Sequence, residues 1–171
     1  MKQPELIVNF EVFENATNFV GLANVDLPNI QNLLQSINGA GISGNVNGVA
    51  IGNTEAMTAT FHFRSGTGSV LDLMKPVKHT IDMRAAEQSW DTVGTGRDIA
   101  ADKYVMVIVP TNYQPGNVAP SAPPDVGMEV SVHYYAGFKD GKKLWEIDPY
   151  NYIYEIDGVD YMADVRRAVG K

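Results

Sequence analysis

Residues that could catalyse a reaction are present, but they do not gather at a chemically useful spacing. Glu146 and Asp148 lie two positions apart, so on a strand both carboxylates point to one face, as a general acid–base pair requires. A solvated strand face produces the same pattern. The three histidines are too far apart for a helical metal pair at i, i+3 or i+4. We expect His62, His79 and His133 to be surface or pore-side strand residues, with no metal site.

Two glycine-rich segments resemble nucleotide-binding motifs only in part. Gly39-Ala40-Gly41-Ile42-Ser43-Gly44 fits G-x-G-x-x-G, which needs a strand before it and a helix after it. Here a helical pattern precedes it and no helix start follows. Residues Gly137 to Lys143 resemble a P-loop, but with one residue too few between the glycines and Lys143 in place of Ser or Thr. We predict a loop and a charged hairpin tip, and no cofactor.

Composition narrows the function further. The 171 residues include no cysteine, which excludes disulfides, Cys-ligated metals and a thiol nucleophile. Lys and Arg number 13 against 20 Asp and Glu, a net charge of -7, the opposite of a protein that grips a phosphate backbone. The longest plain apolar run, Tyr104 to Val109, is far too short for a membrane anchor. With no converging acid, base, nucleophile or metal set, we expect no enzyme.

Strand patterns occupy most of the chain. Short segments of alternating or β-branched residues predict the following strands: Leu6–Phe13, Phe19–Leu27, Ala56–Phe63, Lys103–Val109, Glu129–Ala136, Leu144–Asp148 and Tyr150–Ile156. Within the fifth of these, alternation places Val130, Val132, Tyr134 and Ala136 on one face. Asp140-Gly141 predicts a tight hairpin turn, because both residues tolerate positive φ.

Helix patterns are few. Ile30, Leu33, Leu34 and Ile37 fall at i, i+3, i+4 and i+7 and predict one helix. Two more are expected, from Val70 to Met74 and from Asp160 to Val169. The fold class is therefore mainly β, an antiparallel barrel or sandwich with a short flanking α-helix, in a single domain over residues 1–171.

Two further segments have unusual composition. Residues 110–127 hold five of the nine prolines and predict a long extended loop. Tyr150, Tyr152 and Tyr154 form an aromatic stripe that lacks interleaved cations, so we expect it in the core or at a subunit interface rather than on a nucleic acid.

Three segments in order carry a resemblance to a known family. Asp140–Asp148 reads DG-x-x-L-x-EID, and Asp157-Gly158-Val159-Asp160 is followed by Arg166-Arg167. Earlier, Leu27-Pro28 leads into the glycine-rich residues 39–44. Together they resemble the major tail tube protein of contractile-tailed bacteriophages, over most of the chain. The proline-rich loop departs from that family in length and composition.

The resemblance implies the architecture and the partners. The subunit would be a β-barrel with a flanking helix, six copies would form a ring, and stacked rings would form a hollow tube inside a contractile sheath. The tube would conduct DNA during ejection. Implied partners are other copies of the chain, the sheath protein, baseplate or initiator and terminator proteins, and the tape measure protein and DNA in the lumen. The location would be the virion tail, assembled in the cytoplasm of the host bacterium.

The dimensions and charge fit such a tube. Four lumen strands from each of six copies, spaced by about 4.8 Å and tilted by about 40°, close into a barrel roughly 48 Å across, which leaves about 38 Å for a duplex. Six copies at -7 give -42 per ring. Because DNA is also negative, we predict an acidic or neutral lumen, with Asp82, Arg84 and Glu87 as candidate lumen residues.

Contact between stacked rings is expected at the flexible loop 39–54. Its small polar residues suit a segment that becomes ordered on assembly. The candidate interface residues are Gly41, Ser43, Asn45, Asn47 and Asn53.

Two alternatives remain open at this stage. One is the tube of a phage-derived contractile bacteriocin or another contractile injection system, from which no residue distinguishes a virion tube. The more distant one is a ligand-binding β-sandwich, such as a carbohydrate module, with Trp145 and the tyrosine stripe as its platform.

Overall fold

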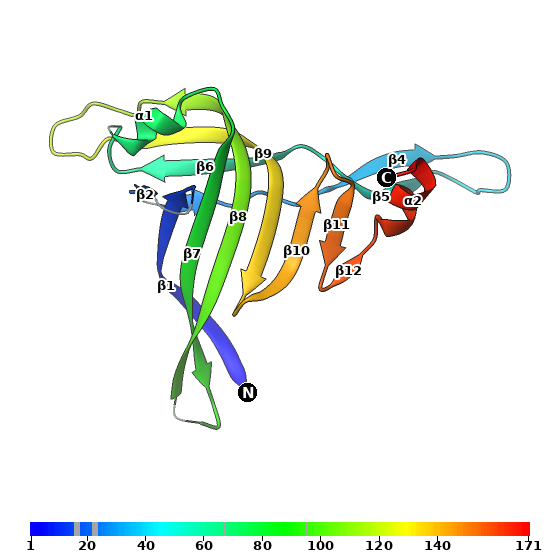
Figure 1. Cartoon of the computed structure of the whole chain (residues 1–171), viewed down its shortest axis with the longest axis horizontal. Helices are drawn as coiled ribbons and strands as arrows, with labels where there is room; N and C mark the ends of the chain where they lie inside the picture. The colour runs from blue at the N-terminus through cyan, green and yellow to red at the C-terminus, as the bar shows by residue number, and fades with distance from the viewer. Residues whose placement is uncertain (16–17, 22–23, 67, 95) are drawn as a thin grey trace.

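The computed structural model describes residues 1–15, 18–21, 24–66, 68–94 and 96–171. Strands dominate this part of the chain, and the two helices are short (Figure 1). In chain order the elements are β1 (Lys2–Glu14), β2 (Asn18–Val20), β3 (Asn24–Asp26), β4 (Asn32–Ile37), β5 (Val46–Thr54), β6 (Met57–Phe63), α1 (Ser69–Leu73), β7 (His79–Asp91), β8 (Gly96–Gln114), β9 (Val126–Lys139), β10 (Lys142–Asp148), β11 (Ile153–Ile156), β12 (Val159–Asp160) and α2 (Ala163–Val169).

One antiparallel sheet folds over itself to make two layers. Its described strands run in the order β12-β11-β10-β9-β8-β7-β1-β2, while β6 pairs with β9 and β3. The first half of β9, Val126–Val132, pairs with β6, and its second half, Tyr135–Lys139, pairs with β10. Both partners use the same edge of β9, so they must diverge, and Figure 1 shows β6 crossing β7 and β8 near their upper ends. The predicted antiparallel sandwich is confirmed.

The hydrophobic core lies between these two layers. Strand β6 alternates strictly, with Met57, Ala59, Phe61 and Phe63 buried and its intervening threonines and histidine more exposed. Facing them are buried side chains of the second layer and of α1: Val12, Val70, Leu73, Ile81, Met83, Met106, Ile108, Tyr135 and Ile147. Burial of this apolar area is the main term that stabilises the two layers against each other.

A β-bulge at His133 changes the face on which the β9 side chains lie. Val107 pairs with Tyr134, and the next residue, Ile108, pairs with Val132, so His133 has no opposite residue on β8. As a result Val132 and Tyr135 face the core while Tyr134 lies on the other side. The expectation that Tyr134 continues the face of Val132 is therefore wrong, because an inserted residue reverses the alternation beyond it.

The helix predicted over residues 30–37 is wrong. Residues Asn32–Ile37 form strand β4, which pairs with β5 in a two-stranded hairpin, and all six β4 residues are exposed. The apolar residues at i, i+3, i+4 and i+7 in this segment therefore do not form the buried face of a helix. The range 39–54 is a loop only as far as residue 45, since Val46–Thr54 is strand β5. After Gly44 the chain continues into this strand, not into a helix.

Other expectations hold with altered boundaries. The strands expected around residues 6–13, 56–63, 103–109 and 144–148 are confirmed. Residues 110–114 belong to β8 and 126–127 to β9, so the proline-rich loop is shorter than predicted. The strand expected at 19–27 divides into β2 and β3, and its residues 22–23 lie outside the described residues. Both expected short helices, α1 and α2, are present.

The predicted hairpin turn between β9 and β10 is confirmed. Asp140 and Gly141 have φ values of 49° and 80°, which are the left-handed values that a two-residue turn between twisted strands requires. The turn pairs Lys143 with Phe138, and an irregularity between Lys143 and Trp145 then places Trp145 opposite Gly137. Trp145 then packs edge-on against Tyr135, with ring centroids 5.5 Å apart.

Gly137 is the position where this packing leaves no room for a side chain. A Cβ at Gly137 would lie 2.3 Å from Cζ2 of Trp145. We expect Gly137→Ala to lower the free energy of unfolding by about 1–3 kcal/mol through overpacking, measured by urea unfolding followed by tryptophan fluorescence. Gly127→Ala on the same strand is the matched control, because its nearest neighbour is the mobile end of Gln114 at 3.2 Å. Equal losses in the two variants would contradict this packing account.

Candidate functional site

The face of the sheet opposite the core is the largest functional candidate, and we call it the open face. It extends across the middle of β1, β7, β8, β9, β10 and β11. The register of the strands assigns the following residues to it: Glu11, Phe13, Asp82, Arg84, Lys103, Val105, Tyr134, Ala136, Phe138, Lys143, Glu146 and Glu155. Unlike the core side, this face carries many charged and half-buried side chains.

Charges on the open face form two adjacent rows that cross the strands. The first row contains three cations, and its cross-strand neighbours are Glu11, Arg84, Lys103, Phe138 and Lys143. The second row lies one pleat further along the strands and is acidic at both ends: it contains Asp82, Val105, Ala136, Glu146 and Glu155. Opposite charges therefore face each other along the strand direction.

Asp82 sits beneath two cations of the first row. Its Oδ2 lies 3.2 Å from Nη2 of Arg84 and 3.5 Å from Nζ of Lys103. The side chain of Asp82 is only 7% exposed, whereas those of Arg84 and Lys103 are 55% and 46% exposed. The other oxygen, Oδ1, is buried without a hydrogen-bond partner among the described residues. The two cations are thus the groups that compensate this buried carboxylate.

Lys143 makes the reverse arrangement at the other end of the rows. It forms an ion pair with Glu146, and its Nζ lies 3.7 Å from Oε2 of Glu155. The hydrogen bond to Glu146 raises the pKa of Lys143. Lys143 thus forms ion pairs with two acids, whereas Asp82 forms ion pairs with two cations. With Glu11, which lies opposite Arg84, the band contains three cations and four acids and has a net charge of -1.

Glu146 and Asp148 do not act as a pair. Glu146 accepts a 3.0 Å hydrogen bond from the Tyr134 hydroxyl, while Asp148 accepts backbone N–H bonds from Tyr150 and Asn151 and holds the turn after β10. Burial, followed by the hydrogen bond to Glu146, raises the pKa of Tyr134 to about 12. Both carboxylates have structural partners, and the arrangement offers no acid–base chemistry.

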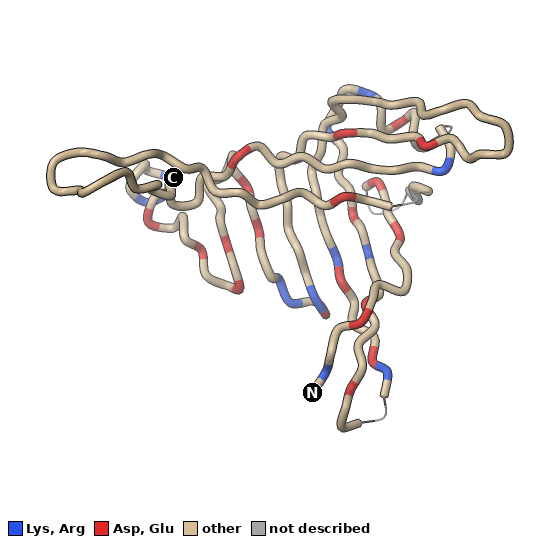
Figure 2. The backbone as a smooth tube through the Cα atoms, turned by 180° about the vertical axis from the view of Figure 1, so that it is seen from behind, with Lys and Arg blue, Asp and Glu red and all other residues tan. Residues whose placement is uncertain are grey.

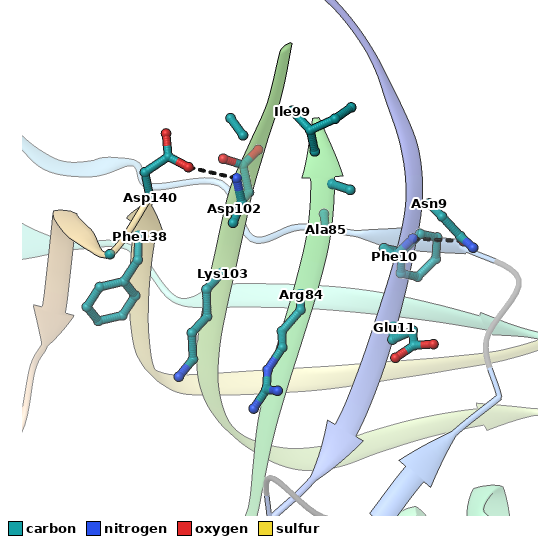
Figure 3. A pocket seen from close by; sticks show the side chains of 14 residues that line it. Asn9, Phe10, Glu11, Arg84, Ala85, Ile99, Asp102, Lys103, Phe138 and Asp140 are labelled. Carbon is teal, nitrogen blue, oxygen red and sulfur yellow. Dashed lines mark hydrogen bonds between the residues drawn. The ribbon is translucent and has the colours of Figure 1, made fainter. Parts of the chain in front are cut away.

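Two hollows deepen the open face on either side of the charged band. The larger, of about 740 Å³, has a floor of small residues that includes Ala86 and Ala101. Figure 3 shows Arg84 and Lys103 extending side by side from neighbouring strands at its border. The second, of about 500 Å³, is lined in part by Val107 and Tyr134. Neither hollow brings together a nucleophile and a base.

The three candidate lumen residues lie on one strand but not on one face. Asp82 and Arg84 are on the open face. Glu87 is an odd number of residues away on the regular strand β7, so it lies on the core side. There it forms an ion pair with Lys139, whose hydrogen bond lowers the pKa of Glu87, while burial raises the pKa of neighbouring Asp102.

The β4–β5 hairpin is the second functional candidate. Between Asp26 and Glu55 the chain has no charged residue, and Figure 2 shows this segment projecting from the body without acidic or basic positions. Large apolar side chains are exposed on both of its strands: Leu33, Leu34, Ile37, Val46, Val49 and Ile51. An exposed apolar cluster of this kind marks a protein–protein contact.

The base of the hairpin is fixed to the body. Gly52 has a φ of 68°, and a Cβ there would lie 2.1 Å from Sδ of Met162, just before α2. The Tyr154 hydroxyl also donates a 3.3 Å hydrogen bond to Asn32. Because its base is held while its strands extend outward, the hairpin is presented as a preformed element.

The candidate interface residues all lie on this hairpin. Gly41, Ser43 and Asn45 are in the connecting turn, and Asn47 and Asn53 are on β5; all five are exposed. Sequence reasoning missed the larger apolar residues beside them, because it assigned Leu33, Leu34 and Ile37 to a buried helix face. The absence of charge over this segment was the signal that could have revealed them.

The histidines have separate partners. His79 is buried, not a surface residue as expected: its Nδ1 lies 2.5 Å from Glu14 and its Nε2 lies 3.0 Å from the Lys75 carbonyl oxygen. His62 pairs with Asp26, and His133 stacks on Tyr150. Within the described residues, no group of histidines and carboxylates could hold a metal ion.

The tyrosine stripe is not formed as predicted. Only residues 153–156 are strand, and Tyr152 has a φ of 54° in the preceding turn, so the three tyrosines do not alternate along one face. Trp145 is half-buried between Tyr104 and Tyr135. The aromatic platform of a carbohydrate module is therefore not found in this part of the chain.

Comparison with known proteins decides the family. The model of the family described as phage tail tube protein FII matches residues 4–170. The chain belongs to this family. It is a tail tube subunit, and the family is one of structural proteins. No curated protein matches the chain, and among the described residues neither helix is long and apolar enough to cross a membrane.

Solved structures with the same fold come from contractile machines. A chain of the PVC sheath/tube terminator of an extracellular contractile injection system, in the extended state, matches with a TM-score of 0.58, 10% identity and coverage of 80% of this chain and 97% of that one. A chain of the anti-feeding prophage baseplate matches with a TM-score of 0.51 at 8% identity, covering 81% and 97%. A chain of the PVC sheath–tube complex matches with a TM-score of 0.50 at 12% identity, covering 76% and 88%.

The raised pKa of Tyr134 predicts that the stability of the protein depends on pH. The pKa of Tyr134 is about 12 in the folded protein and about 10 in the unfolded chain. The stabilisation from its neutral hydroxyl is therefore complete below pH ~10 and is lost between about pH 10 and 12. We expect the urea midpoint of the wild type to fall over that window, and that of Tyr134→Phe to fall less. Parallel curves for the two proteins would show that the buried hydroxyl has no such role.

Proposed function

We propose that six copies of this chain form a ring, and that the rings stack into the inner tube of a contractile tail, through which DNA is ejected. The observation that carries the proposal is the uncharged β4–β5 hairpin, which exposes apolar side chains on both strands and whose base is fixed to the body. A lone subunit leaves this surface in water, whereas a neighbouring copy covers it.

Sheet edges support closure into a ring. Within the described residues, β1 pairs with β7 along most of its length, but on its other side it pairs with β2 only from Val12 to Glu14. At the far end of the sheet, β12 has two residues and also leaves an edge. If the β1 edge of one copy pairs with the β12 edge of the next, neither edge is left exposed. Repeated head-to-tail contacts of this kind can close into a ring.

The open face supports an inward orientation of the sheet. The core fills the opposite side, and the central strands β7, β8, β9 and β10 supply the four lumen strands that the size estimate requires of each subunit. The charged band on this face has four acids and three cations, in keeping with a conduit that does not retain a negatively charged polymer. Asp82 and Arg84 would then line the lumen, and Glu87 would lie behind the wall.

The hairpin supplies the contact between stacked rings. Its exposed turn residues, Gly41, Ser43 and Asn45, would settle against the next ring, while the apolar residues of β4 and β5 provide most of the buried area. The titles of the similar structures name sheath, terminator and baseplate components. We extend such partners to this chain, with the tape measure protein and DNA in the lumen, assembly in the bacterial cytoplasm, and no catalytic role.

A contractile injection system or bacteriocin is the second candidate setting. It is favoured by the origin of the similar solved structures, which come from an extracellular contractile injection system and an anti-feeding prophage. The subunit would assemble in the same way, but the tube would carry no genome. The presence of capsid and terminase genes beside this gene would decide for the phage.

Placing charge on the hairpin tests the proposal. Leu34 and Val49 are cross-strand neighbours with half-exposed side chains. We expect Leu34→Glu/Val49→Glu to remain folded and to raise the protein concentration needed for tubes by about 30-fold or more, since buried unpaired charges at an interface cost at least about 2 kcal/mol. Negative-stain electron microscopy and sedimentation measure this change.

The matched control places a charge outside the hairpin. Val118 is fully exposed in the proline-rich loop, so Val118→Glu should leave both folding and tube formation unchanged. Circular dichroism shows whether each variant is folded. Normal tubes from the folded hairpin variant would overturn the assignment of this hairpin to assembly.

A further inference from the structure

Three cations reach into solvent on the open face although the whole protein is acidic. The net charge is -7, yet the side chains of Arg84, Lys103 and Lys143 are 55%, 46% and 34% exposed. Glu11, opposite Arg84 on β1, is an exposed acid on the same face. Three cations per subunit, repeated around a ring, would attract the phosphates of a duplex. A conduit built on this face therefore needs a means of keeping its cations from binding the cargo.

Three acids lie beneath these cations. The side chains of Asp82, Glu146 and Glu155 are 7%, 16% and 24% exposed, in each case less than the cation that covers them. Oδ1 of Asp82 has no hydrogen-bond partner within the described structure, and Oδ2 accepts its hydrogen bond from Arg84, one of the covering cations. What this carboxylate supplies to its neighbours is negative charge.

We propose that Asp82, Glu146 and Glu155 mask the cations of the open face, and so prevent duplex DNA from binding to it. The inference rests on the proposed function, because it assigns the open face to the lumen. Each cation already has an acid as its counterion, so contact with phosphate would break an ion pair instead of releasing a bound salt ion. The release of such ions is the main source of affinity for DNA, and it is largely removed here.

The arrangement of the two rows allows three acids to pair with all three cations. Arg84 and Lys103 share Asp82, while Lys143 is shared by Glu146 and Glu155. Asp82 and Arg84 are two residues apart on β7, and Lys143 and Glu146 are three residues apart across the irregular register of β10. These acids lie deeper than the cations and within reach of the long Arg and Lys side chains, so each cation is held in an ion pair.

Neutralising the acids tests the mask. The variant is Asp82→Asn/Glu146→Gln/Glu155→Gln, and binding of a short fluorescein-labelled duplex DNA is followed by fluorescence anisotropy at low salt, with protein kept unassembled as judged by sedimentation. We expect the wild type to bind negligibly and the variant to bind at least ~10-fold more tightly, with a slope of log binding constant against log salt of about -2.7 for three phosphates.

A matched variant distinguishes the effect of unmasking the cations from the effect of a less negative net charge. Glu55→Gln/Asp125→Asn/Glu129→Gln removes three exposed acids outside the band, so both variants change the net charge from -7 to -4, that is -7 + 3. We expect no gain in DNA binding from this control. Equal gains in the two variants would overturn the proposal, as would salt-sensitive binding by the wild type.

The remaining outcomes are also decisive. If the triple variant is unfolded by circular dichroism, the single variant Asp82→Asn frees both Arg84 and Lys103 and is expected to give a slope of about -1.8. A folded variant with no gain in binding refutes the mask. Electron microscopy of concentrated wild-type protein reports separately on tubes, so a failure of the tube assignment is distinguishable from a failure of the mask.

Discussion

Strand β9 is the element on which the rest of the structure depends. One edge of this strand pairs with β6 along its first half and with β10 along its second half. Since two strands cannot continue side by side from the same edge, the sheet must divide into two layers there, and His133 is the extra residue that allows the change of direction. The core then fills the space between the layers, and the opposite side of the larger layer becomes the open face.

This division explains why binding surfaces lie where they do. A sheet that uses one side for a core has only its other side and its edges available to partners. The open face holds cations that form ion pairs with acids of the same subunit. In the proposed tube, the sheet edges and the uncharged hairpin are the surfaces that other copies would cover.

The sequence predicted the parts of the fold that depend on local pattern. Strict alternation in residues 57–63 and the positive-φ pair Asp140-Gly141 specify a strand and a turn without tertiary information. Strand β4 at Asn32–Ile37 was missed because the spacing of apolar residues does not distinguish a buried helix face from a strand whose apolar side chains are exposed. The reversal of face at Tyr134 was missed because a bulge arises from pairing with β8 and leaves no mark in the alternation itself.

The sequence predicted some of the residues of the candidate site but not which face they lie on or which partners they have. Asp82 and Arg84 were singled out, but the ion pair of Asp82 with Lys103 depends on strand register, which brings together residues far apart in the sequence. The most direct test of the whole account is a cryo-EM reconstruction of tubes grown from the purified chain. The account predicts hexameric rings with Arg84, Lys103 and Lys143 facing the lumen and the β4–β5 hairpin seated on a subunit of the next ring. A tube with the open face turned outward, or with the hairpin free in solvent, would contradict it.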